Sequence, residues 1–212
     1  MLDADANGYV RGESCHAVLV AKAESAVHGA SRVVALLLGS AVNQDGRSSS
    51  LTAPNGPAQQ AVIRSALGIA AVAPSALHQL SLHGTGTALG DPIEVNAAAS
   101  AMLHRDARRA FSLSLLASKS WHGHAEPDAG LVALDHALLG SRATARPALL
   151  HVRRLNPHII GVLAMLPRGD GTGVAVARQP APLPRLGNSA ELVMSGVSSF
   201  AFAGAIFDVA PP

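Results

Sequence analysis

Two histidines lie on short turns, and each turn follows an apolar run. His83 stands in His-Gly-Thr-Gly-Thr directly after residues 80–82, and His124 stands in the run Lys-Ser-Trp-His-Gly-His-Ala-Glu that begins at Lys119. A histidine at a strand end can point its ring into a crevice, because glycines allow turns that other residues avoid. An imidazole placed there can donate a hydrogen bond to developing negative charge. The two motifs therefore predict one site for acid–base or electrostatic catalysis.

Each motif also has a simpler interpretation. His83 could be a hydrogen-bonded core histidine on a tight turn, and Lys119 could be a surface residue. Glu126 could be an acid that counters a helix dipole, and the same helix start would keep His124 neutral. His122 and His124 could bind a metal, but without a third ligand at matched spacing they make a weak site. The joint occurrence of both motifs favours the catalytic interpretation.

Composition limits the function classes. The 212 residues are 49% apolar and 14% charged, which suits one sizeable core or one half of a larger domain. A net charge of +2 without runs of like charge, together with 3% aromatic residues, argues against a nucleic-acid partner.

The sequence predicts a soluble protein. No secretory signal is recognised at the start, and the longest apolar runs, 33–38 and 159–166, are shorter than the ~20 residues that span a membrane. We expect no membrane partner and a cytoplasmic location, with an organelle such as the plastid as the alternative. Cys15 is the single cysteine, so an intrachain disulfide and a cysteine-cluster metal site are excluded. No metal is predicted.

The apolar runs predict an α/β fold, with a mixed β-sheet layered with α-helices. Near-continuous apolarity indicates strands covered on both faces. Asp91 and Pro92 are suited to the cap and first position of a helix. Residues 142–185, rich in proline, glycine and arginine, are expected to be irregular. Strands are predicted at 15–21, 31–42, 80–82, 113–117, 192–198 and 205–210, and helices at 58–70, 93–103 and 127–139.

Further motifs follow one another in a fixed order and carry a family resemblance. They are Asp-Ala-Asp-Ala-Asn-Gly-Tyr-Val-Arg-Gly-Glu at 3–13, Gly-Ser-Ala-Val-Asn-Gln-Asp-Gly at 39–46, Leu-Thr-Ala-Pro-Asn-Gly at 51–56, Leu-Asn-Pro-His-Ile at 155–159 and Ser-Ser-Phe at 198–200. With the two histidine motifs, nearly the whole chain resembles the C-terminal portion of a β-ketoacyl synthase. It is most similar to the ketosynthase domains of type I polyketide synthases and fatty-acid synthases.

The resemblance implies the C-terminal half of a thiolase-like fold. Residues 1–50 would supply the last strands of the N-terminal ketosynthase half and a connecting loop. Residues 51–212 would form the C-terminal ketosynthase domain, with an irregular connection at 142–190.

The implied reaction is decarboxylative Claisen condensation of acyl and malonyl thioesters, as in an acyltransferase of the 3-oxoacyl-[acyl-carrier-protein] synthase type. The implied partners are an acyl carrier protein, the N-terminal ketosynthase half or neighbouring synthase domains, and a second copy in a homodimer of the intact enzyme. No cofactor is expected to bind directly, because the phosphopantetheine arm is carried by the acyl carrier protein.

The resemblance also assigns roles to individual residues. His83 and His124 match the two histidines that polarise the malonyl thioester carbonyl, and Lys119 matches the lysine that orders them. Thr85 and Thr87 match the positions that hydrogen-bond the phosphopantetheine arm. We expect both histidines to converge in one pocket. The gating phenylalanine, whose backbone N–H contributes to the oxyanion hole, is matched by Phe202.

Other positions depart from the family pattern. Ala205 and Ile206 replace a Thr-Asn pair, and two glycines are lost from the loop at 200–208, which puts its oxyanion hole in question. Trp121 and His122 replace the usual Asn-Ile. Residues 127–128, Pro-Asp, replace paired alanines at the start of a helix.

The family nucleophile, a cysteine in the N-terminal half, has no counterpart here. Cys15 matches a strand position and is expected to be a buried, inert thiol. The chain by itself is therefore expected to be inactive. A non-catalytic ketosynthase-like subunit, structural or carrier-binding, is the alternative. Without its other half, the fold should expose a large apolar surface.

Overall fold

The computed structural model describes most of the chain. The described residues are 1–22, 33–46, 53–102, 111–143, 145–165, 173–182, 193–201 and, by their backbone, 204–210.

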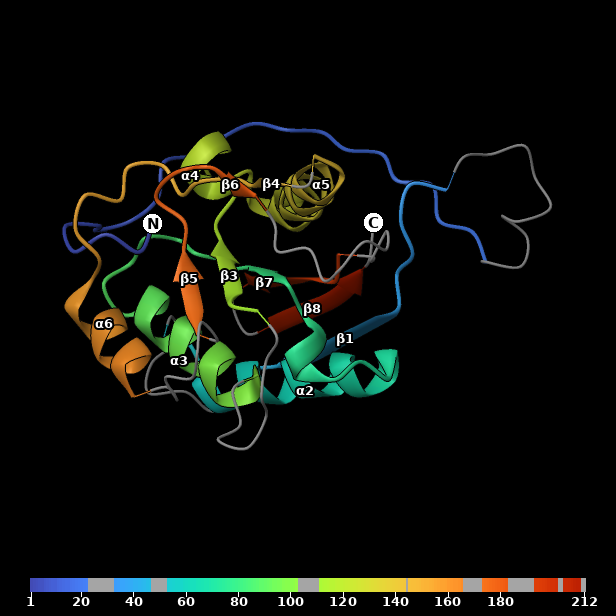
Figure 1. Ribbon diagram of the computed structural model, residues 1–212, viewed down its shortest axis with the longest axis horizontal. Coiled ribbons are helices and arrows are strands. Elements are labelled where there is room, and N and C mark those ends of the chain that lie inside the picture. The colour runs from blue at the N-terminus through green and yellow to red at the C-terminus, as the bar shows by residue number, and fades with distance from the viewer. Residues whose placement is uncertain are drawn as a thin grey trace.

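A six-stranded mixed sheet forms the centre of the molecule (Figure 1). Its strands, in spatial order, are β1 (Gly39–Gln44), β8 (Gly204–Ala210), β7 (Ser195–Ala201), β2 (Gln79–Ser81), β3 (Leu113–Leu116) and β5 (Val174–Val176). The pairs β1–β8 and β8–β7 are antiparallel, whereas β7, β2, β3 and β5 run parallel. The parallel strands β2 and β3 therefore end at the same edge of the sheet.

Helices cover both faces of this sheet (Figure 1). On one side lie α2 (Gly56–Ala70), α3 (Gly90–Met102) and α6 (Pro157–Ala164), and on the other lie α5 (Ala129–Arg142) and the short α4 (Lys119–His122). The predicted layered α/β architecture is confirmed. The remaining short elements are η1 (Pro74–Ala76), η2 (Glu126–Asp128), β4 (Ala145–Arg146) and β6 (Ala181–Pro182).

The main core lies between the sheet and the α2, α3 and α6 layer. Its largest side chains are fully buried and come from every element of that side, so each leucine or isoleucine contributes about 1.5–3 kcal/mol of transfer free energy. They include Ile63, Leu80, Leu82, Met102, Leu113, Leu115 and Ile159. This packing fixes α3 beneath the ends of β2 and β3.

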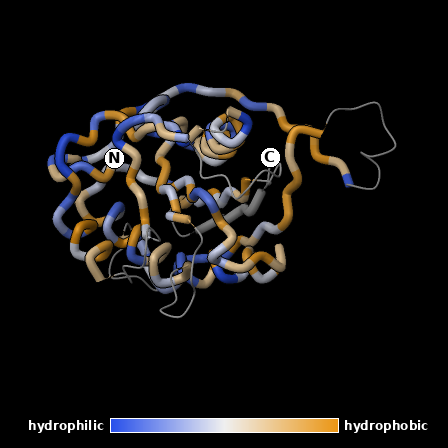
Figure 2. Tube along the Cα trace, viewed as in Figure 1, coloured by the Kyte–Doolittle hydropathy of each residue, from blue (hydrophilic) through white to orange (hydrophobic). Residues whose placement is uncertain are grey.

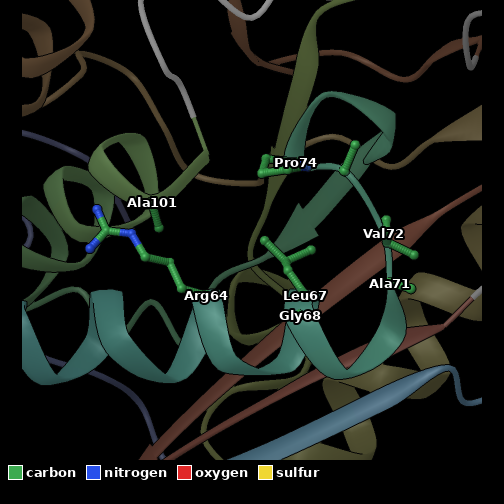
Figure 3. Close-up of a pocket in the computed structure, with 8 residues that line it drawn as sticks. Arg64, Leu67, Gly68, Ala71, Val72, Pro74 and Ala101 are labelled. Atoms are coloured by element: carbon green, nitrogen blue, oxygen red, sulfur yellow. The ribbon is translucent and has the colours of Figure 1, made fainter.

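Local sequence accounts for α2. The Asn55 side chain accepts a hydrogen bond from the Ala58 N–H at 3.2 Å, and Pro57 occupies the first turn, where a missing N–H costs nothing. The helix ends at Ala70, and the next residue, Ala71, caps it in the left-handed conformation with φ of 52°. Beside that end, a hollow of about 390 Å³ opens between α2, α3 and η1 (Figure 3). Arg64 lines this hollow, and its guanidinium donates a hydrogen bond to the Ser100 carbonyl at 3.0 Å.

Three expectations about the fold need correction. The span 142–185 is more regular than its prolines and glycines suggested, because α6 and β5 lie within it. The Asn156 side chain caps α6 by accepting from the His158 N–H, a start signal that was overlooked in the sequence. Helix α3 begins at Gly90, so Asp91 lies within its first turn and does not cap it. The predicted strand at 31–42 begins only at Gly39, as β1, which pairs with β8.

Residues 17–22 and 33–38 are extended but form no strand in the described part of the chain. Val18, Leu19, Val33 and Leu37 in these segments are each about half exposed or more. Figure 2 shows both segments as apolar stretches that run beside the body of the molecule. The predicted strand at 15–21 is therefore wrong here, since a strand needs a partner for its hydrogen bonds. Both segments therefore leave apolar side chains exposed.

None of the described helices has the length and apolar character needed to cross a membrane.

Candidate active site

The topology of the sheet brings the two histidine motifs together. His83 follows β2, and Lys119 begins α4 just after β3 at the same edge. The imidazole rings of His83 and His124 meet edge to face with centroids 5.3 Å apart. Phe200, in β7, lies 5.7 Å from His83 by ring centroids. The expected convergence of the two histidines is confirmed.

Lys119 contacts His83 at two points. Its Nζ donates to the His83 carbonyl oxygen at 2.6 Å and lies 3.3 Å from His83 Nδ1. The side chain is 5% exposed. It is therefore no surface lysine, and its charge acts inside the site.

Two buried carboxylates on α3 hold the turn that carries His83. Glu94 accepts from the backbone N–H of His83 at 2.6 Å and of Gly84 at 2.8 Å. Asp91, one helical turn earlier, accepts from the Gly86 N–H at 2.9 Å. Both glycines have positive φ, 47° and 71°, which explains why this turn needs them. The turn is therefore fixed through its main chain, while its side chains remain available.

His124 is held through its backbone and its ring. Its N–H donates to the Val10 carbonyl at 2.8 Å, and its carbonyl accepts from the Gly12 N–H at 2.9 Å. Its Nδ1 accepts from the Glu126 N–H at 2.9 Å. The ring of Tyr9 packs against the imidazole with centroids 4.5 Å apart.

These contacts define the tautomer of each histidine. A backbone N–H can only donate, so His124 Nδ1 is the acceptor and the proton of the neutral ring lies on Nε2. A lysine ammonium also only donates, which places the proton of neutral His83 on Nε2 as well. Both rings thus keep an Nε2–H donor that is not used for orientation by the residues the structure describes.

Burial and charge keep both imidazoles neutral. Burial lowers the pKa of His83 from 6.5 to about 2, and the nearby charges of Lys119 and His124 add to this. The pKa of His124 is also lowered, first by burial and then by Lys119. Burial raises the pKa of Glu94 and lowers that of Lys119, while their opposite charges act against both changes.

Thr85 and Thr87 lie next to His83 on the same turn. Their hydroxyl oxygens are 3.3 Å apart, and Thr87 Oγ1 accepts from the Gly90 N–H at 3.0 Å. Thr87, not Asp91, therefore satisfies an N–H at the start of α3. Both threonines are partly exposed. Phe202 lies outside the described residues.

A cleft of about 650 Å³ borders the site on the side of Lys119. Trp121 and His122 line it, and the Trp121 indole N–H donates to the Ala148 carbonyl at 2.7 Å. The His122 ring faces His136 at 6.0 Å, not a cluster of ligands. Within the described ranges, no group of three or more histidine, cysteine or acidic side chains could hold a metal ion.

The sequence matches the family described as β-ketoacyl synthase, C-terminal domain, over residues 34–153, which is more than half of the chain. The chain belongs to the β-ketoacyl synthase family. The resemblance inferred from the motifs is thereby confirmed. The ketosynthase match includes His83 and Lys119 together with His124.

Relatives of this ketosynthase chain are polyketide synthases. It is 37% identical over 202 residues to a phenolphthiocerol/phthiocerol polyketide synthase of Mycobacterium tuberculosis, and the alignment covers 95% of the chain and 10% of that protein. A second phenolphthiocerol/phthiocerol polyketide synthase of the same organism is 42% identical over 157 residues, covering 74% of the chain and 10% of that protein. The chain thus spans about a tenth of the length of these relatives.

Solved structures confirm the thiolase-like fold. An oxazolomycin ketosynthase domain from Streptomyces albus superposes with a TM-score of 0.89 at 32% identity, covering 99% of this chain and 36% of that one. The ketosynthase from module 6 of the bacillaene synthase of Bacillus subtilis shares the fold with a TM-score of 0.81 at 22% identity. It is likewise covered over 36% of its length.

The expectation for Cys15 was wrong in one respect. Its thiol is exposed, not buried, because the segment around it has no strand partner among the described residues. It remains the single cysteine of this ketosynthase chain.

Sequence reasoning also missed several residues of the site. Glu94 and Asp91 were interpreted as parts of a helix, although two acids on the buried side of an alanine-rich helix signal internal partners. Tyr9 and Phe200 lie far from the histidines in sequence, and nothing in their spacing indicated that they would contact the rings.

Because burial lowers the pKa of His83 and His124, these two groups should cost the ketosynthase chain stability in acid. His83 has a folded pKa of about 2 against 6.5 when unfolded, so its contribution is complete above pH 6.5 and falls as the pH drops. We expect His83 alone to cost about 1–2 kcal/mol of unfolding free energy between pH 6.5 and 5. Urea unfolding followed by circular dichroism at both values measures this.

The His83→Phe variant serves as the comparison for that measurement, because it keeps an aromatic ring without a titrating group. Its unfolding free energy should depend less steeply on pH. The remaining slope should combine the acid-labile contributions of His124 and of His136, whose pKa burial lowers to about 4, with an opposing contribution of Glu94, whose pKa burial raises to about 7. Equal slopes in both proteins would contradict the assignment to His83.

Proposed function

We propose that this chain supplies the enolate-stabilising half of a polyketide ketosynthase site. The observation that supports it most directly is the pair of neutral imidazoles, 5.3 Å apart by ring centroids, each with Nδ1 engaged and Nε2–H left as donor. Two such donors suit one oxygen atom that gains negative charge during a reaction.

In the proposed reaction, the Nε2–H groups of His83 and His124 donate to the carbonyl oxygen of a malonyl thioester. The malonyl carboxylate leaves as CO₂, and its bonding electrons form the enolate that these donors stabilise. The enolate carbon then attacks an acyl thioester on a cysteine, and the thiolate of that cysteine leaves. Since Cys15 is exposed and outside the contacts of the site, the nucleophile is supplied by another segment.

Lys119 has two tasks in this scheme. Its hydrogen bonds to His83 fix the ring and carbonyl of that residue. Its charge lowers the pKa of both imidazoles, after the larger effect of burial. A neutral imidazole keeps its hydrogen-bond donor without adding a fixed charge, in the way that helix starts tune other catalytic histidines.

The substrate is proposed to arrive on the phosphopantetheine arm of an acyl carrier protein. Thr85 and Thr87 suit this arm, because their partly exposed hydroxyls lie beside His83 on a turn whose main chain is already fixed. The arm supplies the thioester. The chain binds and orients it through these hydroxyls.

The alternative function is non-catalytic: the chain would be part of a ketosynthase-like protein that binds an acyl carrier protein. The replacement of the family's Thr-Asn pair by Ala205 and Ile206 favours it, since polar groups that would support an oxyanion hole are lost. The two functions differ in one measurable respect, the release of CO₂.

The test is malonyl decarboxylation by the chain after a ketosynthase N-terminal half with its cysteine is added. CO₂ release from malonyl-loaded acyl carrier protein is expected for the combination and not for either part. A combined sample that forms a stable complex yet releases no CO₂ above the uncatalysed rate would overturn the catalytic proposal and leave the carrier-binding one.

A further inference from the structure

A second polar cluster, formed by Ser14, His16 and Asp128, has no place in the reaction described above. Asp128 Oδ2 accepts from the Ser14 hydroxyl at 2.5 Å and lies 2.7 Å from His16 Nδ1. The hydrogen bonds from Ser14 and His16 lower the pKa of Asp128, so it is a carboxylate at neutral pH. Asp128 is also one of the positions at which the chain departs from the paired alanines of the family pattern.

The segment that contains Ser14 and His16 is also the one that holds His124. Residues 9–16, here named the strap, run across the loop at 122–128. Val10 and Gly12 use the main-chain N–H and C=O of His124, and the Tyr9 ring packs on the imidazole. Arg11 adds an exposed ion pair to Glu126 at 3.1 Å.

The strap and the loop approach each other too closely for side chains between them. A Cβ at Gly12 would overlap the carbonyl oxygen of His122, and a Cβ at Gly123 would come within 2.9 Å of the Val10 carbonyl oxygen. The position of the His124 main chain is therefore set by the position of the strap.

Within the described ranges, the strap has few anchors besides these. Beyond His16, residues 17–22 are extended and form no strand in the part of the chain that the structure describes. Asp128 thus marks the place where the strap is last fixed to the body of the molecule, at the start of α5. In Figure 1 the same stretch passes above α4 and α5 before it leaves the body.

We propose that Ser14, His16 and Asp128 form a latch that keeps the strap closed and thereby positions His124. Asp128 is a positioning residue, since it acts on His124 through the strap and touches no substrate. The catalytic consequence rests on the proposed function, but the structural consequence does not. Loss of the latch should release Val10 and Gly12 from His124 while Lys119 and His83 stay in place.

The test compares Asp128→Ala with Asp135→Ala in the whole chain. Asp135 is an exposed acid on α5, the helix that directly follows Asp128, so its removal changes the charge equally without touching the strap. Amide hydrogen exchange of Gly12 and His124, followed by NMR, should become at least about tenfold faster in Asp128→Ala only. Amides of β2 and β3 should keep their protection.

The imidazole provides a second readout that general destabilisation would not produce. In ¹H NMR spectra, the carbon-bound ring protons of His124 should shift in Asp128→Ala, because the Tyr9 ring of the released strap no longer packs on the imidazole. Asp128→Asn keeps an acceptor for Ser14 and should restore most of the original spectrum. His16→Ala removes the other partner, and it replaces Asp128→Ala if that variant does not fold.

These measurements need no substrate, so they separate this inference from the proposed reaction. Unchanged exchange at Gly12 and His124 in a folded latch variant would overturn the latch, whatever the decarboxylation assay gives. Faster exchange throughout the sheet would also overturn it, because it would show a general loss of stability. If no CO₂ is released while exchange changes as expected, the latch is supported and the proposed reaction is contradicted.

Discussion

Replacing His124 by alanine is expected to lower the rate of malonyl decarboxylation about 10²–10³-fold, the usual loss when one donor of a charge-stabilising pair is removed. His83→Ala should cause a loss of the same size, since both rings present Nε2–H from the same place. Because the two donors are proposed to share one oxygen, the double variant should lose less than the product of the two single losses. CO₂ release from the chain combined with an N-terminal half measures all three.

His158→Ala is the matched control, because His158 is an exposed histidine on α6 and uses its backbone N–H, not its ring, to bind Asn156. Its decarboxylation rate should equal that of the unmodified chain. A loss in His158→Ala as large as in His124→Ala, or strictly multiplicative losses in the double variant, would show that His83 and His124 do not act on one oxygen.

Glu94→Ala is expected to lower the unfolding free energy by about 3–5 kcal/mol. The variant leaves the buried N–H groups of His83 and Gly84 without an acceptor. It also removes the stronger of the two opposite charges that act on the Lys119 ammonium, the other being Asp91. Urea unfolding at pH 7 measures the change. Glu94→Gln should cost less, since its amide keeps one of the two acceptors.

The contribution of charge can be separated by a double variant. Glu94→Ala combined with Lys119→Ala should be less destabilised than the sum of the single variants, because it no longer buries an unbalanced charge. Glu13→Ala, which removes an exposed acid, should change stability by less than about 0.5 kcal/mol. A fully additive double variant would argue that Glu94 acts through hydrogen bonds alone.

The order of strands and helices was largely readable from the sequence where burial is complete. β2 and β3 are short and covered on both faces, so their apolar runs stand out, and α2 carries its own start signals at Asn55 and Pro57. The segments at 15–21 and 33–38 were misread for the opposite reason. Their apolar residues do not pair with any described strand, and pairing is not a local property.

The candidate site likewise contains residues that the sequence could place and contacts that it could not. His83, Lys119 and His124 could be placed together, because residues that follow neighbouring parallel strands meet at one edge of the sheet. Their supporting contacts could not be predicted. Asp128 was noticed only as a departure from the family pattern, and its link to His16 spans 112 residues of sequence. The catalytic roles of His83, Lys119 and His124 are proposals.

The support of the His83 turn by α3 has a consequence for recombination between synthases. Glu94 and Asp91 hold His83, Gly84 and Gly86 across sequence separations of only 5 to 11 residues. Residues 83–94 should therefore keep the conformation of the turn when they are moved together to a related chain. A crossover within residues 83–94 would join a turn to a helix that was never selected to hold it, so functional chimeras should have their junctions outside this stretch.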